Sequence, residues 1–476
     1  MAAAAPALSR ENAAGQLWPL IAVGLVAFGA ACGYAIVFGE VAAFSVTLAL
    51  VAAIAVMFDF RLGAVLLIVL LPFGATSFLP RSVLGIPALN PWNILIVATF
   101  VSYAFRGRLK DLAPAPLIWC VVLPMLVAGL MGMPHVQHIH PSFFESENPQ
   151  FLNEFGYFRE LAVRPLLIPV MAMLVGAAVA RSQKPERFLA VLIPSVWIIA
   201  LVVLYFIFAS GIRHLSVLAS PYERGFFNDL GVHANQLGRL FAVAYGLLLF
   251  AWWESKNPRF KAAAFVTLGV AALGMVLTFS RAGMLAFFVV NGLFLLWKLN
   301  ARTVALAIVA AGIAMALSPE YLWNRITFGF NADANTVSAN RIDEIWAPLL
   351  PELWNSPLWG NGIGSIMWSE PLLNGEMMAV SHAHNAYLDT FYDMGLIGLS
   401  LLLFFYWKVW KGFRALGSNA YLSPEMRGFF QGATAVLVAF FITAMSGSSL
   451  RPDSDFGYLW LAIGMMYGML ARKPAG

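Results

Sequence analysis

Long runs of apolar residues alternate with short polar connections along most of the chain. About 14 of these runs are long enough for helices, and several approach the roughly 20 residues that span a bilayer. Barrel strands would instead alternate between apolar and polar positions. The pattern predicts an all-α, polytopic membrane protein with about 12 to 14 transmembrane helices, the lower figure applying if short runs are re-entrant or tilted. The runs lie near 17–38, 41–58, 62–79, 91–105, 114–133, 164–180, 188–210, 233–253, 262–279, 283–297, 303–317, 385–407, 428–447 and 457–471.

Composition excludes a soluble protein, because 61% of the residues are hydrophobic and only 11% are charged. The net charge of +5 is modest and does not indicate a nucleic-acid partner. Cys32 and Cys120 both lie within apolar runs, so we expect no disulfide and no thiolate metal site. The polar N-terminal residues 1–16 have no early apolar core, which favours a short tail over a cleaved signal peptide.

The basic residues predict an orientation. Every lysine falls in connections on one side, which the positive-inside rule makes cytoplasmic. The other side holds all seven histidines and several arginines. Arginine binds phosphate through a planar fork, so a phosphate-recognising face is one interpretation, and pairing of two or three arginines with loop acids is the alternative. These arginines are Arg81, Arg159, Arg164, Arg213, Arg224, Arg281, Arg325, Arg341 and Arg451.

We expect one membrane domain over residues 1–476, with two long outer loops at 134–163 and 318–384. The second loop, of about 65 residues, is too long for a plain connector, so it should be partly helical and functional. The first loop carries three closely spaced histidines that could converge on a metal, but it has no cysteine. These histidines are His135, His138 and His140.

Two histidines lie at the outer mouth of one predicted membrane helix. His382 and His384 precede an apolar stretch that runs from Asn385 to about Trp407, roughly 35 Å as a helix. The basic and aromatic residues that follow it are typical of a cytoplasmic boundary. A titratable imidazole at the opposite end would meet both water and substrate.

The same helix carries polar and small residues that a plain membrane anchor does not need. Asp389 and Asp393 follow Asn385 at four-residue steps, so the three side chains share one helix face. Gly395 and Gly398 allow a neighbouring helix or a lipid chain to approach closely.

The spacing His384-Asn385, nine residues, then Gly395-Leu-Ile-Gly398 resembles the signature of the O-antigen ligase and polysaccharide polymerase family of membrane glycosyltransferases. Two earlier segments resemble further family elements in the right order. Arg281 stands in TFSRAG at 278–283, and Arg341 stands with Trp346 in SANRIDEIW at 338–346.

The resemblance implies a GT-C-like fold and a donor glycan carried on undecaprenyl pyrophosphate. In it, Arg281 and Arg341 hold the pyrophosphate and stabilise the charge that it develops on leaving, with no metal and no cofactor. His384 is the expected base for the acceptor hydroxyl, since an imidazole with an ordinary pKa of about 6.5 is neutral near pH 7. The alternatives are a snorkelling Arg281 at a helix end and a solvated Arg341 on an amphipathic loop helix.

Other polar residues are candidates for substrate binding. His233, Asn235 and Arg239 enter an apolar helix within 224–239 and would line a cavity. The alternative is a helix capped by Asn228 or Asp229, with hydrogen bonds between helices. Gly362 belongs to a glycine-rich turn whose N–H groups would contact phosphate or sugar, a bare tight turn being the alternative. Asn385 could hold a sugar hydroxyl, and Asp389 lies on the same helix face.

We therefore expect a multi-pass glycosyltransferase of the bacterial inner membrane, with its site facing the periplasm. The acceptor is the next lipid-linked repeat unit for a polymerase and lipid A–core for a ligase. The long loops and numerous segments favour the polymerase. Expected partners are the lipid-linked glycan, the acceptor glycan or lipid, membrane lipids, a flippase and a chain-length regulator.

Two other classes stay open. A transporter would use Asp389 and Asp393 as a midplane ion site, and broken helices in matching positions of two halves would favour it. A non-catalytic assembly scaffold is the third possibility.

Overall fold

A computed structural model describes residues 41–76, 82–83, 86–87, 90–106, 112–144, 153–212, 214–327, 333–447 and 449–472. The expectations for the apolar run 17–38 and the N-terminal tail lie outside these residues. So do those for Cys32, Arg81 and Arg213.

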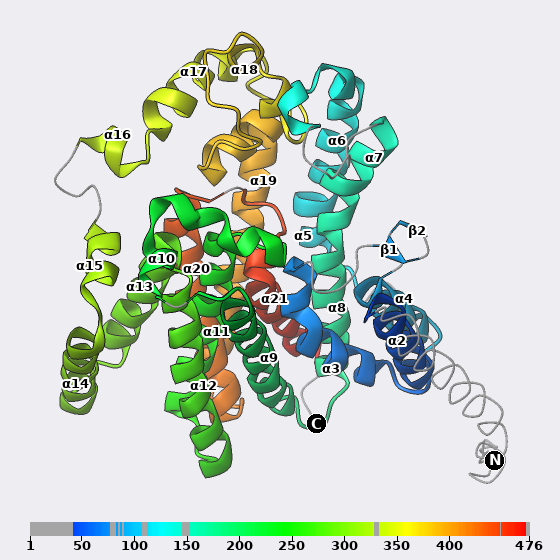
Figure 1. The fold of residues 1–476 in the computed structure, drawn as a ribbon. Coiled ribbons are helices and arrows are strands. Elements are labelled where there is room, and N and C mark those ends of the chain that lie inside the picture. Colours follow the sequence, from blue (N-terminus) through cyan, green and yellow to red (C-terminus); the bar gives the residue numbers. More distant parts are fainter. Residues whose placement is uncertain are drawn as a thin grey trace, which may run out of the picture.

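The predicted apolar runs form helices close to their expected bounds (Figure 1). Seven helical stretches of the described chain are long and apolar enough to cross a membrane, which confirms a polytopic helical membrane protein. The helices that fill the runs are α2 (Val41–Phe58), α3 (Phe60–Leu70), α4 (Pro91–Ala104), α6 (Leu123–Gly132), α8 (Leu167–Ala180), α9 (Arg187–Ala209), α11 (Ala234–Glu254), α12 (Pro258–Leu277), α13 (Arg281–Trp297), α14 (Ala301–Leu317), α19 (Ala386–Gly417), α20 (Pro424–Ala444) and α21 (Gly457–Leu470).

Short elements extend or connect these helices. α5 (Ala115–Leu117) leads into α6, and α7 (Glu154–Phe158) leads into α8, each through a π-helical turn. α10 (Ser216–Ala219) precedes a 3₁₀ segment at Pro221–Leu230. Strands in the described residues are limited to β1 (Ser82–Val83) and β2 (Ile86–Pro87), which pair antiparallel.

Local sequence sets where helices begin. Asn257 accepts hydrogen bonds from the backbone N–H of Arg259 and Phe260, and Pro258 is the first residue of α12. At α20, Ser423 accepts from the N–H of Met426. A capping side chain satisfies N–H groups that the first turn cannot, and proline at the first position needs no such partner.

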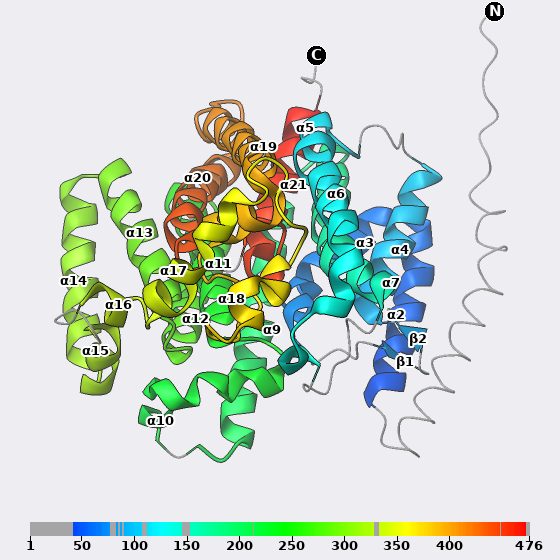
Figure 2. The same cartoon turned by 90° about the horizontal axis from the view of Figure 1, so that it is seen from above.

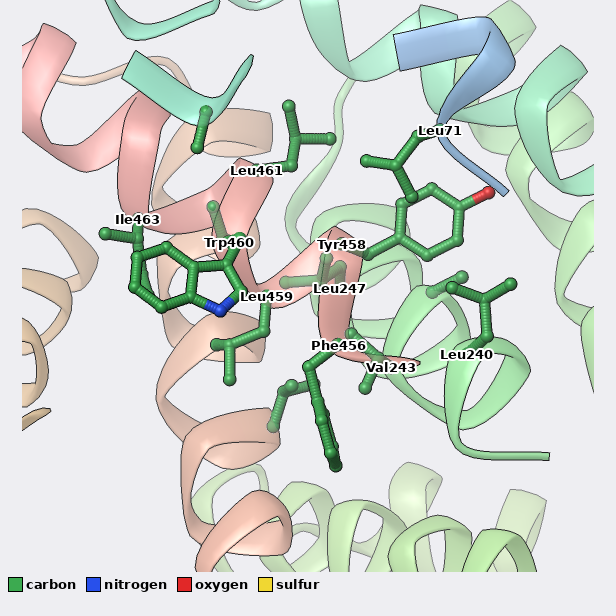
Figure 3. Packing of buried hydrophobic residues seen from close by; sticks show 14 of the residues in the cluster. Leu71, Leu240, Val243, Leu247, Phe456, Tyr458, Leu459, Trp460, Leu461 and Ile463 are labelled. Atoms are coloured by element: carbon green, nitrogen blue, oxygen red, sulfur yellow. The ribbon is translucent and has the colours of Figure 1, made fainter. Parts of the chain in front are cut away.

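The tightest packing joins α8 to α21. A Cβ on Gly464 would lie 1.8 Å from the carbonyl oxygen of Ala172, and one on Gly468 would lie 2.1 Å from that of Gly176. We call these four residues the seam. Small residues let the two backbones touch, which is how helices associate in lipid. Figure 3 shows large buried side chains at the start of α21, where Tyr458 lies beside Leu71 and Leu247. Trp460 points to the other side and stacks on Phe405 of α19, with ring centroids 5.7 Å apart.

One end of the bundle collects basic residues. Lys298 and Arg427 both pair with Glu254, with N–O distances of 2.6 and 3.3 Å. Arg472 donates to the backbone oxygen of Ser182 at 2.8 Å. The predicted cytoplasmic connections that the structure describes therefore lie together, at the bottom of the view in Figure 1.

The opposite end is covered by residues 333–385, here called the cover (Figures 1 and 2). The long outer loop is partly helical, as predicted. Its apolar side chains, including Ile345, Leu349 and Ile366, pack with Tyr392 on the first half of α19. The helices of the long outer loop are α15 (Glu320–Thr327), which precedes the cover, and α16 (Ala334–Val337), α17 (Ala347–Leu349) and α18 (Glu370–Leu373) within it. A π-helical turn lies at Ile342–Trp346.

Candidate functional site

Helix α19 is broken at Gly395, where φ is +64° and ψ is −172°. A Cβ there would lie 2.3 Å from the backbone of Leu358, so only glycine fits. The N–H groups of Leu396 and Ile397 donate to the carbonyl oxygens of Pro357 and Leu358, at 2.8 and 3.2 Å. The predicted close approach at Gly395 is therefore made by the cover, where a helix or a lipid chain was expected.

The glycine-rich turn of the cover is bound to the same break. Gly362 donates its N–H to the carbonyl oxygen of Asp393 at 3.0 Å. The Asp393 carboxylate accepts from the N–H of Gly364 at 2.9 Å and from the N–H and hydroxyl of Ser365. These amides have protein partners, which favours the tight-turn interpretation of Gly362 over direct contact with phosphate.

Arg451 joins the two aspartates of α19. Its guanidinium lies 3.1 Å from Asp393 and 3.5 Å from Asp389, and both carboxylates are almost fully buried. Asp389 also accepts a hydrogen bond from the N–H of Ala383 at 3.2 Å. Asp389 thus fastens the chain just before α19, a role that sequence reasoning did not assign to it.

Residues 381–385, here called the histidine segment, are the last residues of the cover and lead directly into α19. His384 has a left-handed backbone with φ of +53°, and its ring centroid lies 4.1 Å from that of His382. Asn385 accepts from the N–H of Tyr387 and Leu388 and so caps α19. Trp346 donates its indole N–H to the carbonyl oxygen of Ala383 at 2.8 Å. Both histidine rings are half-buried.

Cationic groups from three parts of the chain gather around His382. Burial first, and then the charges of Arg239, Arg341, His233 and Arg451, together lower the pKa of His382 to about 4. His382 is therefore neutral near pH 7 in a region of positive potential. Sequence reasoning noted His382 but did not place it in the candidate site; its proximity to His384 was the available signal.

The start of α11 supplies two of these groups. His233 caps the helix, accepting from the N–H of Asn235 at 3.1 Å, and Gln236 accepts from the N–H of His233. Arg239 is 4% exposed and pairs with Asp455 at 2.5 Å. The sequence analysis did not predict Asp455 as a partner of Arg239. The polar residues just before the last apolar segment were the one feature of the sequence that pointed to a buried acid there.

Arg281 is the first residue of α13 and is half-buried. The preceding Ser280 accepts from the N–H of Gly283 and donates its hydroxyl to Asn235 at 2.9 Å. A Cβ on Gly238 would lie 2.7 Å from Ser280. These contacts hold the beginnings of α11 and α13 together. Asn235 forms a hydrogen bond between helices, which was the alternative to its lining a cavity.

The remaining outer residues have other surroundings. Arg159 and Arg164 both pair with Glu160, as the alternative interpretation predicted for two or three arginines. His135 stacks on Trp368 with centroids 5.5 Å apart. Within the described residues, no group of three His, Cys, Asp or Glu side chains is placed to hold a metal.

Residues 266–403 match the protein family described as O-antigen ligase. The matched stretch contains Arg281, Arg341 and His384 and supports the O-antigen ligase and polymerase family, which confirms the resemblance drawn from the sequence. No curated protein matches this chain.

Proposed function

We propose that this chain, whose residues 266–403 carry the O-antigen ligase match, is a glycosyltransferase that uses a glycan on a polyprenyl-pyrophosphate carrier as donor. The reaction takes place at the end of the bundle that carries the cover, facing the periplasm from the inner membrane. The supporting observation is that His384 lies against His382, and that His382 in turn lies near cationic groups that include Arg341 and Arg239.

In the proposed step, an acceptor hydroxyl oxygen bonds to the anomeric carbon of the donor sugar. The bond from that carbon to the pyrophosphate oxygen breaks, and its electron pair stays with the pyrophosphate. His384 takes the proton from the hydroxyl as the new bond forms. Arg281 and Arg341 stabilise the negative charge that grows on the leaving group, so the scheme needs no metal.

The other candidate residues position these groups in this proposal. Asn385 caps α19 next to His384, and Asp389 holds the N–H of Ala383. Gly362 lets the cover approach the broken helix, while His233 and Asn235 fix the start of α11. Arg239 is buried below the site and adds to its positive potential. Both aspartates that a transporter would use for an ion are paired with Arg451, which favours transfer over transport.

We further propose that the acceptor is the next lipid-linked repeat unit, so that the protein is a polymerase working with a flippase and a chain-length regulator. The test is purified full-length protein given a defined lipid-linked repeat unit, alone or with lipid A–core. A ladder of oligomers on the carrier is expected from the repeat unit alone. Product found only on lipid A–core would make the protein a ligase, and transport without transfer would overturn both.

The same assay tests whether Arg281 and Arg341 together hold the pyrophosphate, an arrangement here called the clamp. Lysine keeps the charge but loses the planar fork. Arg281→Lys and Arg341→Lys should therefore fail almost as badly as the alanine variants, raising the barrier by roughly 2–4 kcal/mol. Near-wild-type turnover in both lysine variants would remove the clamp, and activity lost to a chelator would show that a metal takes part.

A further inference from the structure

One side of the cover presents apolar side chains to its surroundings. These side chains belong to residues 350–359, here called the rim. Trp354 is 75% exposed and Trp359 is 58% exposed, and Leu350 and Leu358 are each 51% exposed. Apolar patches of this kind mark a contact with another protein or with a membrane.

The one charged residue of the rim is turned into the protein. Glu352 accepts hydrogen bonds from the hydroxyl of Tyr392 on α19 and from the N–H of Glu370, the latter at 2.8 Å. The exposed residues of the rim therefore include two tryptophans and two leucines but no charged side chain. This composition favours an apolar partner, and tryptophan is enriched where the hydrocarbon of a bilayer meets its headgroups.

The rim is continuous with an exposed apolar stripe on α19. The rim lies directly against the start of this stripe, because the N–H of Leu396 donates to the carbonyl oxygen of Pro357 at 2.8 Å. α19 is one of the helices that are long and apolar enough to cross a membrane, and an exposed apolar face of such a helix meets acyl chains. The stripe consists of Leu396, Ile397, Leu403, Phe404 and Trp407, each between 37% and 52% exposed.

The length of α19 below the rim gives the depth of this contact. Lys408 and Lys411 end the stripe, and their ammonium groups lie 5.3 and 3.7 Å from the ring centroid of Trp407, as is typical of a helix at the membrane boundary. The helix rises roughly 18 Å from Lys408 back to Leu396, whereas the hydrocarbon core is about 30 Å thick. The rim therefore meets α19 roughly 12 Å inside the boundary on the cover side, and a tilt of the helix places the contact deeper.

We propose that the rim is embedded in the bilayer leaflet on the cover side and contacts lipid acyl chains. The predicted outer loop 318–384 is then partly an intramembrane element, and lipid anchors one side of the cover. Irregular backbone is tolerated at this depth where its polar groups are paired, as the carbonyl oxygens of Pro357 and Leu358 are with α19. The contact requires only lipid, so it holds whether or not the protein transfers a glycan.

Photolabelling of the wild-type, full-length protein tests the proposal. The protein is placed in nanodiscs that contain phosphatidylcholine with a diazirine in one acyl chain, irradiated, digested and analysed by mass spectrometry. Lipid adducts are expected on Leu358 and Trp359, as on Phe404 of the stripe. Tyr421 is the matched control, because it is 99% exposed in the polar connection between α19 and α20, and it should carry none. Adducts on Phe404 without any on the rim would overturn the proposal.

Thiol labelling in the same nanodiscs separates lipid from water and from a protein partner. In a chain whose two native cysteines are replaced, Trp359→Cys should react with an impermeant maleimide at least about tenfold more slowly than Asn374→Cys, because hydrocarbon suppresses the reactive thiolate. Asn374 is an exposed polar residue of the same cover and serves as the control. Equal rates would place the rim in water. Efficient disulfide-linked dimers of Trp359→Cys would show that a second copy covers it, and either result would overturn the proposal.

Discussion

The seam between α8 and α21 and the cover over α19 are both close contacts, but different interactions hold them. In the seam, glycine and alanine let two backbones touch, and the flanking side chains are apolar. In the cover, polar side chains hold backbone groups, and His384 has a left-handed backbone. We infer that substitutions in the seam damage folding, whereas most substitutions of the histidine segment damage chemistry alone.

Arg451 tests the limit of that contrast, because it lies at the cover end but neutralises Asp389 and Asp393 inside the protein. Arg451→Ala leaves two buried carboxylates without a cation and should lower the free energy of unfolding by about 3–5 kcal/mol. Thermal unfolding in detergent measures the loss. Adding Asp389→Asn and Asp393→Asn to Arg451→Ala should restore part of the stability. A stable single variant would show that water already reaches these carboxylates.

The seam offers the next largest effect. In Gly464→Ala the new methyl would lie 1.8 Å from the Ala172 oxygen, so α8 and α21 must separate, at a loss on the order of 3 kcal/mol. Gly269→Ala is the matched control, because that glycine lies on α12 with nothing within 4 Å. It should stay within about 1 kcal/mol of wild type. Equal melting temperatures for the two variants would contradict the tight seam.

The fold was largely predictable because each membrane helix is specified by its own residues. Lipid and the absence of water make a long apolar run helical whatever its neighbours are. The break at Gly395 was not predictable for the opposite reason. It depends on Leu358 and Pro357, which are near it only in the folded chain. The glycine was noticed in the sequence, but a helix partner fitted the local pattern equally well.

In the candidate site, too, local motifs could be predicted from the sequence and contacts between distant residues could not. Arg281, Arg341 and His384 were identified from local motifs. The pairing of Arg239 with Asp455 joins residues 216 positions apart, and no local pattern connects them. Asn385, Asn235 and Gly362 were chosen as polar or flexible positions, and the structure shows that each has a protein partner. A sequence indicates which groups are unusual, but the partners decide which of them remain available to a substrate.

His384 is the proposed base, and we expect that its chemistry can be removed without harm to the fold. His384→Ala should reduce glycan transfer at least about 100-fold, the usual contribution of a positioned base, while the melting temperature stays near that of wild type. Glycan laddering in a deletion strain and with purified protein measures it. His138→Ala, an exposed histidine of the other outer loop, should keep full activity. Full-length polysaccharide from the His384 variant would remove that residue from the mechanism.

His382 gives the smallest effect and the finest test of the contrast, because it links stability to pH within the cover. Its pKa in the folded protein is about 4, through burial first and then through the charges of Arg239, Arg341, His233 and Arg451. An unfolded histidine titrates near 6.5, so between about pH 6.5 and pH 4 the unfolded chain binds more protons than the folded one. Stability is therefore fully present above pH 6.5 and is lost as the pH falls toward 4.

His382→Asn removes this titration, so its melting temperature should fall less than that of wild type between pH 7 and pH 5. His138→Asn serves as the control and should follow wild type, because that ring is exposed. A bound pyrophosphate would place negative charge among the same cations and should flatten the wild-type curve, since it offsets the charges that disfavour protonated His382. Parallel curves for wild type and His382→Asn would mean that water and ions screen the charged groups around His382. They would contradict the buried surroundings that lower its pKa.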